Sequence, residues 1–457
     1  MTERHDPGLP AADQIPPALL QVSPPRATVA ARRRTVISEL KRMRKAEAIT
    51  PEEYAERREV YKSAKQQAAR LPGIRKVELA GFIKQVEGIA ARGALTVSRL
   101  EALWLGIRRN RQWWSTGPLL ASGQRVSFSG SEVVWQYVPG QGIQFHPLAN
   151  FGKLNGLWQG KTFDARLAVL LDELLTLPAE RAGGLAWEYD YTFAGGAPPW
   201  TSALSQGTAL QALARAAVRL RRQEEVFPVA RLGLKIFETP PPAGVRQKTP
   251  DGAHYLIYSY RPKLFVLNGF IQALNGLKDF GGIANDDRAK QLFADGDAAA
   301  REEVPRYDTG AWSLYSRGEA SRESDLSYHR LLRDFLRGLC DRTERSVYCN
   351  AETNLTEYLS EPPELELVSE RVRAGTDSLL RFRVSKISRV TMRVAYGSKL
   401  VFSHSVVVGY GNRTYTWKVP RSERGVHAWQ VTATDLAGNT STEQGELRVL
   451  RAKRRRK

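Results

Sequence analysis

The chain has 457 residues, more than one hydrophobic core usually supports, so two or three domains are expected. Hydrophobic residues make up 42% and charged residues 25%, as in folded globular proteins, and no apolar run is long enough for a membrane span, which excludes an integral membrane protein. A net charge of +20, from 68 Lys and Arg against 48 Asp and Glu, favours a polyanion as partner: nucleic acid, anionic lipid or acidic polysaccharide.

The N-terminal part is expected to be a tail followed by helices. Residues 1–30 carry six prolines and little periodicity, which predicts a disordered Pro-rich tail. They contain no apolar core of the kind found in secretory signals, so the sequence gives no support for export. A helical pattern covers 31–120, where Thr50, Pro51 and Glu53 predict an N-cap, a first-turn proline and a reciprocal glutamate.

A short β region precedes a long helical one. Clustered β-formers at 133–138 and a turn signal at 139–142 predict a small sheet within 121–146. Over 147–361, apolar residues recur at helical spacing, and loops rich in Gly, Pro and aromatic residues separate the helices. Helices in series with such loops predict an α/α toroid, an incomplete barrel, although an ordinary helical bundle has the same periodicity.

The C-terminal part changes to an alternating pattern. Strands separated by turns over 362–450 predict a β-sandwich. Its segment 433–439 is similar to the closing hairpin of bacterial Ig-like and fibronectin-like modules, which usually act as spacers or adhesion units, so no chemistry is assigned to it. A basic tail follows at 451–457. The expected fold class is therefore mainly α with a C-terminal β-sandwich.

The cysteines and histidines do not indicate a metal site. Cys340 and Cys349 are the only cysteines, and a disulfide and two free thiols both fit their spacing. A disulfide would place the protein outside the reducing cytoplasm. The six histidines show no paired ligand spacing and no calcium-loop motif is present, so no metal is expected.

Four segments in the middle of the chain carry a family resemblance. They are GIQFHPLANFG at 142–152, APPWTSALSQG at 197–207, PKLFVLNGF at 262–270, and YDTG at 307–310 followed by SYH at 327–329. In order and spacing they resemble the C-terminal domain of the D-glucuronyl C5-epimerase family, here with an appended Ig-like or fibronectin-like module as in a bacterial member. The resemblance implies the toroid, a uronic-acid polysaccharide as substrate and no cofactor.

The resemblance also implies site residues. In the family, tyrosines and one glutamate are implicated as acid/base groups, and the tyrosine positions carry over as Tyr258, Tyr315 and Tyr328. The residues implied to bind substrate are Trp200, Gln206, Arg261, Asn268, Arg317 and His329. For the aromatic residues and for Asn268, a purely structural role as core anchor or helix cap is the alternative.

The chain departs from the family pattern at two places that matter for chemistry. Leu256 and Ile257 replace both glutamates of the family's W-Y-E-E-Y-P motif, and His254 is an alternative base. Gly318 stands where the family has an arginine, and Arg317 lies one residue earlier. The normal proton-transfer groups are therefore incomplete.

The leading hypothesis is an isomerase that inverts C5 of D-glucuronate, or a related hexuronate, within an acidic polysaccharide. The resemblance suggests a heparosan-like glycosaminoglycan or another glucuronate polymer. A polysaccharide lyase, which begins with the same proton abstraction, and a non-catalytic uronan-binding envelope protein are the alternatives. Specific nucleic-acid binding is not expected, because only the basic tails favour it. The family favours an extracytoplasmic or envelope location, and a homodimer remains an open option.

Overall fold

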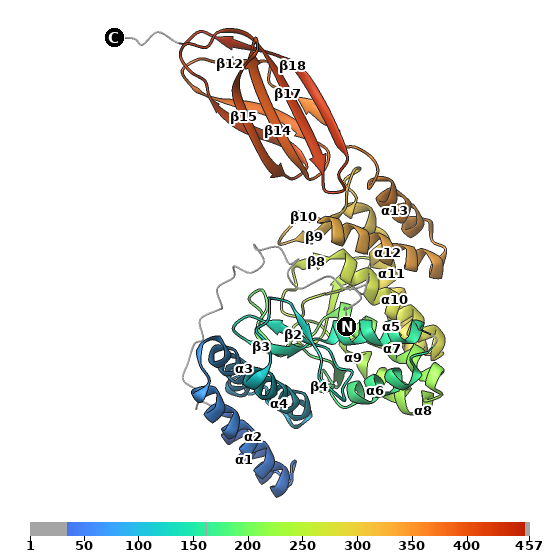
Figure 1. Cartoon of the computed structure of the whole chain (residues 1–457). Helices are drawn as coiled ribbons and strands as arrows, with labels where there is room; N and C mark the ends of the chain where they lie inside the picture. Colours follow the sequence, from blue (N-terminus) through green and yellow to red (C-terminus); the bar gives the residue numbers. More distant parts are fainter. Residues whose placement is uncertain (1–33, 161, 453–457) are drawn as a thin grey trace. The chain divides into compact units, whose positions relative to one another are not determined.

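The computed structural model of the chain describes residues 34–160 and 162–452 (Figure 1). The Pro-rich tail predicted for 1–30 and most of the basic tail predicted for 451–457 lie outside the described residues. Among the helices that are described, none is both long enough and apolar enough to cross a membrane.

The chain divides into two compact units. The first contains the residues up to 265 together with 269–300, and the second contains 266–268 together with the residues from 301 onward. β8 (Leu264–Val266) and α10 (Leu267–Ile283) contribute residues to both units.

The first unit opens with the helices expected for the N-terminal region. They are α1 (Val36–Lys45), α2 (Pro51–Arg70), α3 (Gly73–Ala91), the short 3-10 helix η3 (Val97–Arg99) and α4 (Leu100–Thr116). The capping box predicted at the start of α2 is confirmed, because the Glu53 amide donates to Thr50 Oγ1 at 3.1 Å and the Thr50 amide donates to Glu53 Oε2 at 2.7 Å. This box fixes where α2 begins.

The small β region is held by buried polar side chains from the helices before it. β1 (Arg125–Val126), β2 (Trp135–Val138) and β3 (Gly142–Phe145) form an antiparallel sheet in that order. Glu78 of α3 accepts hydrogen bonds from Tyr137 and from the amides of Gly140 and Gly142, and Asn110 of α4 bonds both ways with the backbone of Ile143. The N-terminal helices and this sheet therefore form one packed structure.

The remaining helices of the first unit surround one central helix. Their bounds are α5 (Pro147–Gln159), α6 (Asp164–Leu175), α7 (Ala203–Leu220), α8 (Gln223–Gly233), α9 (Lys235–Glu238) and α11 (Asp287–Glu303), with hairpins β4 (Ala179–Arg181)/β5 (Gly184–Ala186) and β6 (Arg246–Thr249)/β7 (Gly252–Tyr255). α7 is buried on nearly all sides, as expected of a core helix. A Cβ on Gly276 of α10 would lie 1.9 Å from the carbonyl oxygen of Gly207 in α7, so glycine is required at this close approach. The largely helical character is confirmed, and the α/α toroid, an incomplete barrel, stays a prediction.

The second unit combines a helical hairpin with strands. Its first elements are η4 (Val304–Tyr307), β9 (Leu314–Gly318), β10 (Arg322–Glu323), α12 (Leu326–Thr343) and α13 (Ser346–Glu357). Cys340 of α12 and Cys349 of α13 form a disulfide, so of the two states that fit the sequence the structure has the bonded one. The disulfide links the two helices of the hairpin.

The expected C-terminal β region is present as two sheets that share one core (Figure 1). The strands are β11 (Leu365–Leu367), β12 (Arg371–Arg373), β13 (Asp377–Val384), β14 (Ser388–Tyr396), β15 (Lys399–Val408), β16 (Gly411–Lys418), β17 (Gly425–Asp435) and β18 (Thr440–Leu450). One sheet has the order β11-β13-β16, and the other has the order β12-β18-β17-β14-β15. Burial alternates along β13, which matches the two-residue period seen in the sequence.

A buried lysine connects the sandwich to the end of the helical hairpin. Lys386 is 1% exposed, and its Nζ lies 3.1 Å from Asp435 Oδ2. The same ammonium group donates to the carbonyl oxygens of Tyr358, at 2.8 Å, and Glu361, at 2.5 Å. Its Nζ also lies 5.5 Å from the ring centroid of Trp312. One cation therefore joins the sandwich, the residues that follow α13 and the loop before β9.

Replacing this lysine should destabilise the second unit. Lys386→Met leaves the Asp435 carboxylate buried without its cation, so we expect the free energy of unfolding to fall by about 3–5 kcal/mol. Lys399→Met, at an exposed position on β15, is the matched control and should change it by less than about 0.5 kcal/mol. Urea unfolding followed by tryptophan fluorescence measures both, and equal transition midpoints for the two variants would contradict the role of the buried pair.

Candidate functional site

In the first unit, Trp200 lies at the centre of an aromatic cluster. Its backbone pairs with Tyr189 through hydrogen bonds of 2.9 and 3.1 Å, and the two rings stack with centroids 4.1 Å apart. The indole Nε1 donates to the carbonyl oxygen of Tyr191 at 2.9 Å. Trp200 is only 4% exposed, so its contacts are those of an anchor that holds the loop between Tyr189 and α7.

The start of α7 brings buried polar atoms next to this cluster. Gln206 is 1% exposed and its Nε2 donates to the carbonyl oxygen of Trp187 at 2.8 Å. Within the described part of the chain, Gln206 Oε1 and Thr201 Oγ1 are buried and have no hydrogen-bond partner. The amides in the first turn of a helix carry partial positive charge. An anionic group would therefore be favoured at this helix end, where the Thr201 hydroxyl could donate to it, whereas Gln206 Oε1 can only accept a hydrogen bond.

Tyr258 belongs to the same aromatic cluster. Its ring centroid lies 5.9 Å from that of Trp200, 5.7 Å from Phe193 and 5.6 Å from Tyr260, and 7% of its surface is exposed. The amide of Arg261 donates to the Tyr258 carbonyl oxygen at 3.0 Å and closes the turn after the tyrosine. The first unit therefore brings Trp200, Tyr258 and the start of α7 together, with Arg261 in the adjoining turn.

The residues that replace the family's glutamates are core residues. Leu256 is 0% and Ile257 is 8% exposed. The Leu256 carbonyl oxygen accepts a hydrogen bond of 2.9 Å from the amide of Ala203 at the start of α7. His254, the alternative base, is 0% exposed and its ring centroid lies 4.2 Å from that of Phe270. Its apolar surroundings favour a core role for this histidine.

The second unit brings two of the predicted tyrosines into contact. Tyr315 of β9 and Tyr328 in the first turn of α12 have ring centroids 4.6 Å apart, and they are 5% and 7% exposed. Asp325 caps α12 by accepting a hydrogen bond of 2.8 Å from the Tyr328 amide, which fixes where this tyrosine begins the helix. The second unit therefore contains two of the three predicted catalytic tyrosines, and it brings them into contact.

Two other predicted residues of the second unit have different surroundings. The Arg317 guanidinium lies 5.7 Å from the ring centroid of Tyr307 and donates to the carbonyl oxygen of Arg306. Burial raises the pKa of Tyr307 above its ordinary value, and the nearby Arg317 partly opposes that rise. Asn268 is 4% exposed near the start of α10.

His329 is held by the protein on all sides. Its ring stacks on Trp312 with centroids 3.7 Å apart, its Nδ1 lies 2.9 Å from Ser313 Oγ, and its Nε2 lies 2.9 Å from the Leu355 carbonyl oxygen. Burial lowers the pKa of His329 to about 4, so the ring is neutral at physiological pH. These contacts favour a supporting role over the substrate contact that the sequence predicts, because both ring nitrogens have partners within the protein.

Comparison with known proteins finds a family match for the central part of the chain. Residues 182–357 match the family model of the D-glucuronyl C5-epimerase C-terminus. This segment belongs to that family. It contains all nine predicted site residues, from Trp200 to His329.

Two relatives show how far the similarity extends. The D-glucuronyl C5-epimerase of Caenorhabditis elegans is 31% identical over 131 residues, which cover 26% of this chain and 21% of the worm protein. An uncharacterized protein of Methanocaldococcus jannaschii is 26% identical over 171 residues, or 36% of this chain and 54% of that protein. The chain thus spans about a fifth and about half of the length of these relatives.

The similarities to solved structures are weaker. Fibronectin(III)-like modules of Clostridium thermocellum CbhA match 20% of this chain over their full length, with 23% identity and a TM-score of 0.15. An endo-beta-1,4-mannanase of Thermotoga petrophila matches 41% of this chain and 45% of its own, with 12% identity and a TM-score of 0.17. Scores this low support no inference about the fold.

The epimerase-family segment also contains a buried acidic group that the sequence did not single out. Glu188 is 5% exposed and accepts hydrogen bonds from Arg99, at 2.6 and 2.9 Å, and from Arg181, at 2.6 Å. Asp190 follows two residues later, and its buried Oδ1 has no hydrogen-bond partner among the described residues. Burial and the neighbouring Glu188 raise the pKa of Asp190 from 3.8 to about 7, against the opposing effect of the two arginines.

Aromatic and acidic residues alternate along 187–191, and this alternation is the sequence signal from which Glu188 and Asp190 could have been found. Tyr189 and Tyr191 lie on the side of Trp200, so Glu188 and Asp190 point to the opposite side of the extended segment, toward the two arginines. Asp190 therefore does not take the place of the missing glutamates beside Tyr258.

The raised pKa of Asp190 predicts how stability depends on pH. Between about pH 4 and pH 7 the folded chain holds a proton that the unfolded chain has released, so the free energy of unfolding falls as pH rises, by up to about 1.4 kcal/mol per pH unit. Asp190→Asn removes this proton. We expect the variant to be more stable than the unmodified chain at pH 8, with a gain that shrinks toward pH 4.

Urea unfolding at several pH values measures this difference. Asp287→Asn is the control, because the Asp287 side chain is 95% exposed and should leave the pH profile unchanged. Parallel profiles for the unmodified chain and Asp190→Asn would show that Asp190 does not retain its proton near neutrality.

Proposed function

We propose that this protein inverts C5 of D-glucuronate, or of a related hexuronate, within an acidic polysaccharide. The observation that carries the proposal is the contact between Tyr315 and Tyr328, 4.6 Å apart inside the segment that matches the epimerase family. Inversion needs one group that removes the C5 proton and one that returns a proton to the opposite face. Tyr258, in the first unit, is a separate candidate.

The chemistry places demands on the surroundings of these tyrosines. An unperturbed tyrosine has a pKa near 10, so at neutral pH it holds its proton and can serve as the acid, but it needs nearby positive charge to lose that proton and act as a base. The carboxylate of the sugar must also be stabilised as charge develops on it. Arg317, in the same unit as Tyr315 and Tyr328, is the group we propose for that role.

The absence of the family's two glutamates is the reason for the main alternative to epimerase activity. Leu256 and Ile257 are buried apolar residues, so proton removal falls to the tyrosines in this proposal. The same observation favours a non-catalytic protein that binds uronans. A lyase shares the first step and is distinguished by its unsaturated, ultraviolet-absorbing product.

The disulfide bears on where the protein works. We infer an extracytoplasmic or envelope location, because disulfides persist in oxidising compartments and are rare in reducing ones.

Proton exchange at C5 tests the proposed reaction. The full chain is incubated in heavy water with glucuronate-containing polysaccharides, and deuterium at C5 is followed by NMR. Tyr328→Phe removes a proton-transfer hydroxyl and should lower the rate of incorporation by about 100-fold or more. Tyr396→Phe, at a site 52% exposed on β14, is the control and should exchange normally.

The possible outcomes of this experiment distinguish the three candidate functions. Exchange in Tyr328→Phe at the normal rate would remove this tyrosine from the mechanism. Binding without exchange across several uronans would favour the non-catalytic reading, and an ultraviolet-absorbing product would favour the lyase.

A further inference from the structure

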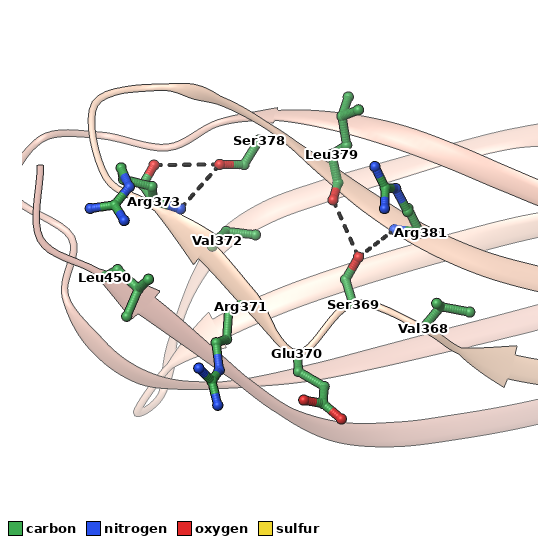
Figure 2. Close-up of a pocket in the computed structure, with 10 residues that line it drawn as sticks. All are labelled: Val368, Ser369, Glu370, Arg371, Val372, Arg373, Ser378, Leu379, Arg381 and Leu450. Carbon is green, nitrogen blue, oxygen red and sulfur yellow. Dashed lines mark hydrogen bonds between the residues drawn. The ribbon is translucent and has the colours of Figure 1, made fainter. Parts of the chain in front are cut away.

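A hollow lies at the edge of the sandwich where its first strand passes from one sheet to the other. β11 pairs with β13, whereas β12 pairs in parallel with β18 of the other sheet, and residues 368–370 connect the two. The hollow has a volume of about 510 Å³ and is shown in Figure 2. Its lining combines three arginines with apolar side chains and contains a single acidic residue, Glu370.

Strand geometry places the arginines on the outer surface of the sandwich. Arg371 and Arg373 flank the buried Val372 on β12, and Arg381 occupies an exposed position on β13. Side chains alternate along a strand, so arginines at these positions point away from the core. Figure 2 shows their guanidinium groups around the hollow, on both sides of the strand crossing.

The guanidinium groups around the hollow make few polar contacts with the described part of the protein. Over 34–160 and 162–452, the side chains of Arg371 and Arg381 form no ion pair or hydrogen bond with the protein. Arg373 Nη1 donates to the carbonyl oxygen of Arg451 at 3.1 Å and has no acidic partner in the same ranges. The positive charge of the hollow is thus not neutralised by contacts within the described structure.

Two serines fix the backbone that carries these arginines. Ser369 Oγ accepts a hydrogen bond from the Arg381 amide at 2.8 Å and donates to the Leu379 carbonyl oxygen at 3.2 Å. Ser378 Oγ accepts from the Arg373 amide at 3.2 Å. These bonds, drawn as dashed lines in Figure 2, tie the strand crossing to β13, so the backbone that carries the arginines is held before any ligand binds.

We propose that this hollow binds carboxylate groups of an acidic glycan, as a second contact site apart from the tyrosine-containing segment. Arginine forks match carboxylates with two parallel hydrogen bonds. Val368 and Leu379, which are 49% and 48% exposed, offer apolar surface for the CH groups of sugar rings. The choice of a uronate polymer rests on the function proposed above. The site would hold a long polymer on the protein between catalytic events.

Binding of the full chain to a glucuronate-containing polysaccharide at low salt tests the proposal. The double variant Arg371→Gln/Arg381→Gln should bind about tenfold more weakly. Arg389→Gln/Arg393→Gln removes the same charge from exposed positions on β14 and should bind within about twofold of the unmodified chain. Equal weakening in both variants would show general charge attraction and overturn the site, and so would no weakening in the first.

Two further measurements separate this site from the proposed catalysis. Arg371→Lys/Arg381→Lys keeps the charge without the forks and should restore only part of the binding; full restoration would overturn the bidentate contact. With C5 exchange as readout, Arg371→Gln/Arg381→Gln should raise KM for the long polymer and leave the rate on a short oligosaccharide unchanged. If the unmodified chain shows no exchange, the loss of binding in this variant still supports the hollow, while the catalytic proposal fails.

Discussion

The first unit depends on one buried carboxylate. Glu188 accepts two hydrogen bonds from Arg99, just before α4, and one from Arg181 in β4. Leaving two arginines without this partner would cost several kcal/mol, because an unpaired buried charge is strongly unfavourable. The extended segment that carries Glu188 also carries Tyr189, which pairs with Trp200 just before α7. The position of the aromatic cluster is therefore set by an ion pair on the opposite side of its own backbone.

This arrangement extends the structural domain beyond the family match. Arg99 lies outside residues 182–357, and so does Arg92, which donates to the carbonyl oxygen of Pro198 at 2.5 Å. Gln141 adds a further link, because its side chain bonds both ways with the backbone of Thr192. The N-terminal helices and the small sheet thus support the loops of the epimerase-family segment, and removing them would leave those loops without several of their partners.

The sequence predicted the structural features that depend on residues close together in the chain. The capping box at Thr50, the helical periodicity and the alternation of the C-terminal strands all arise within a few residues. The sequence could not predict burial, pKa values or contacts that depend on residues far apart in the chain. Lys386 has the sequence context of a surface lysine, yet its ammonium group is buried against Asp435. The pKa of Asp190 is set by burial and by charges from Arg99, about ninety residues earlier in the chain. Likewise, the motif that contains His329 does not reveal that both ring nitrogens are occupied.

The replaced glutamates show why family membership and catalysis are separate questions here. At Leu256 the contact with α7 is made by the backbone carbonyl oxygen, which accepts the Ala203 amide whatever side chain the residue bears. Leucine and isoleucine also fill the core at these positions at no cost in buried charge. The fold can therefore keep the Tyr258 segment in place after both carboxylates are lost. What is lost is the group with a low pKa, so in the proposed reaction the base is a tyrosine whose pKa would be lowered by positive charge. For the proposed reaction, the positive charge beside each tyrosine, rather than the fold itself, is therefore the requirement that matters.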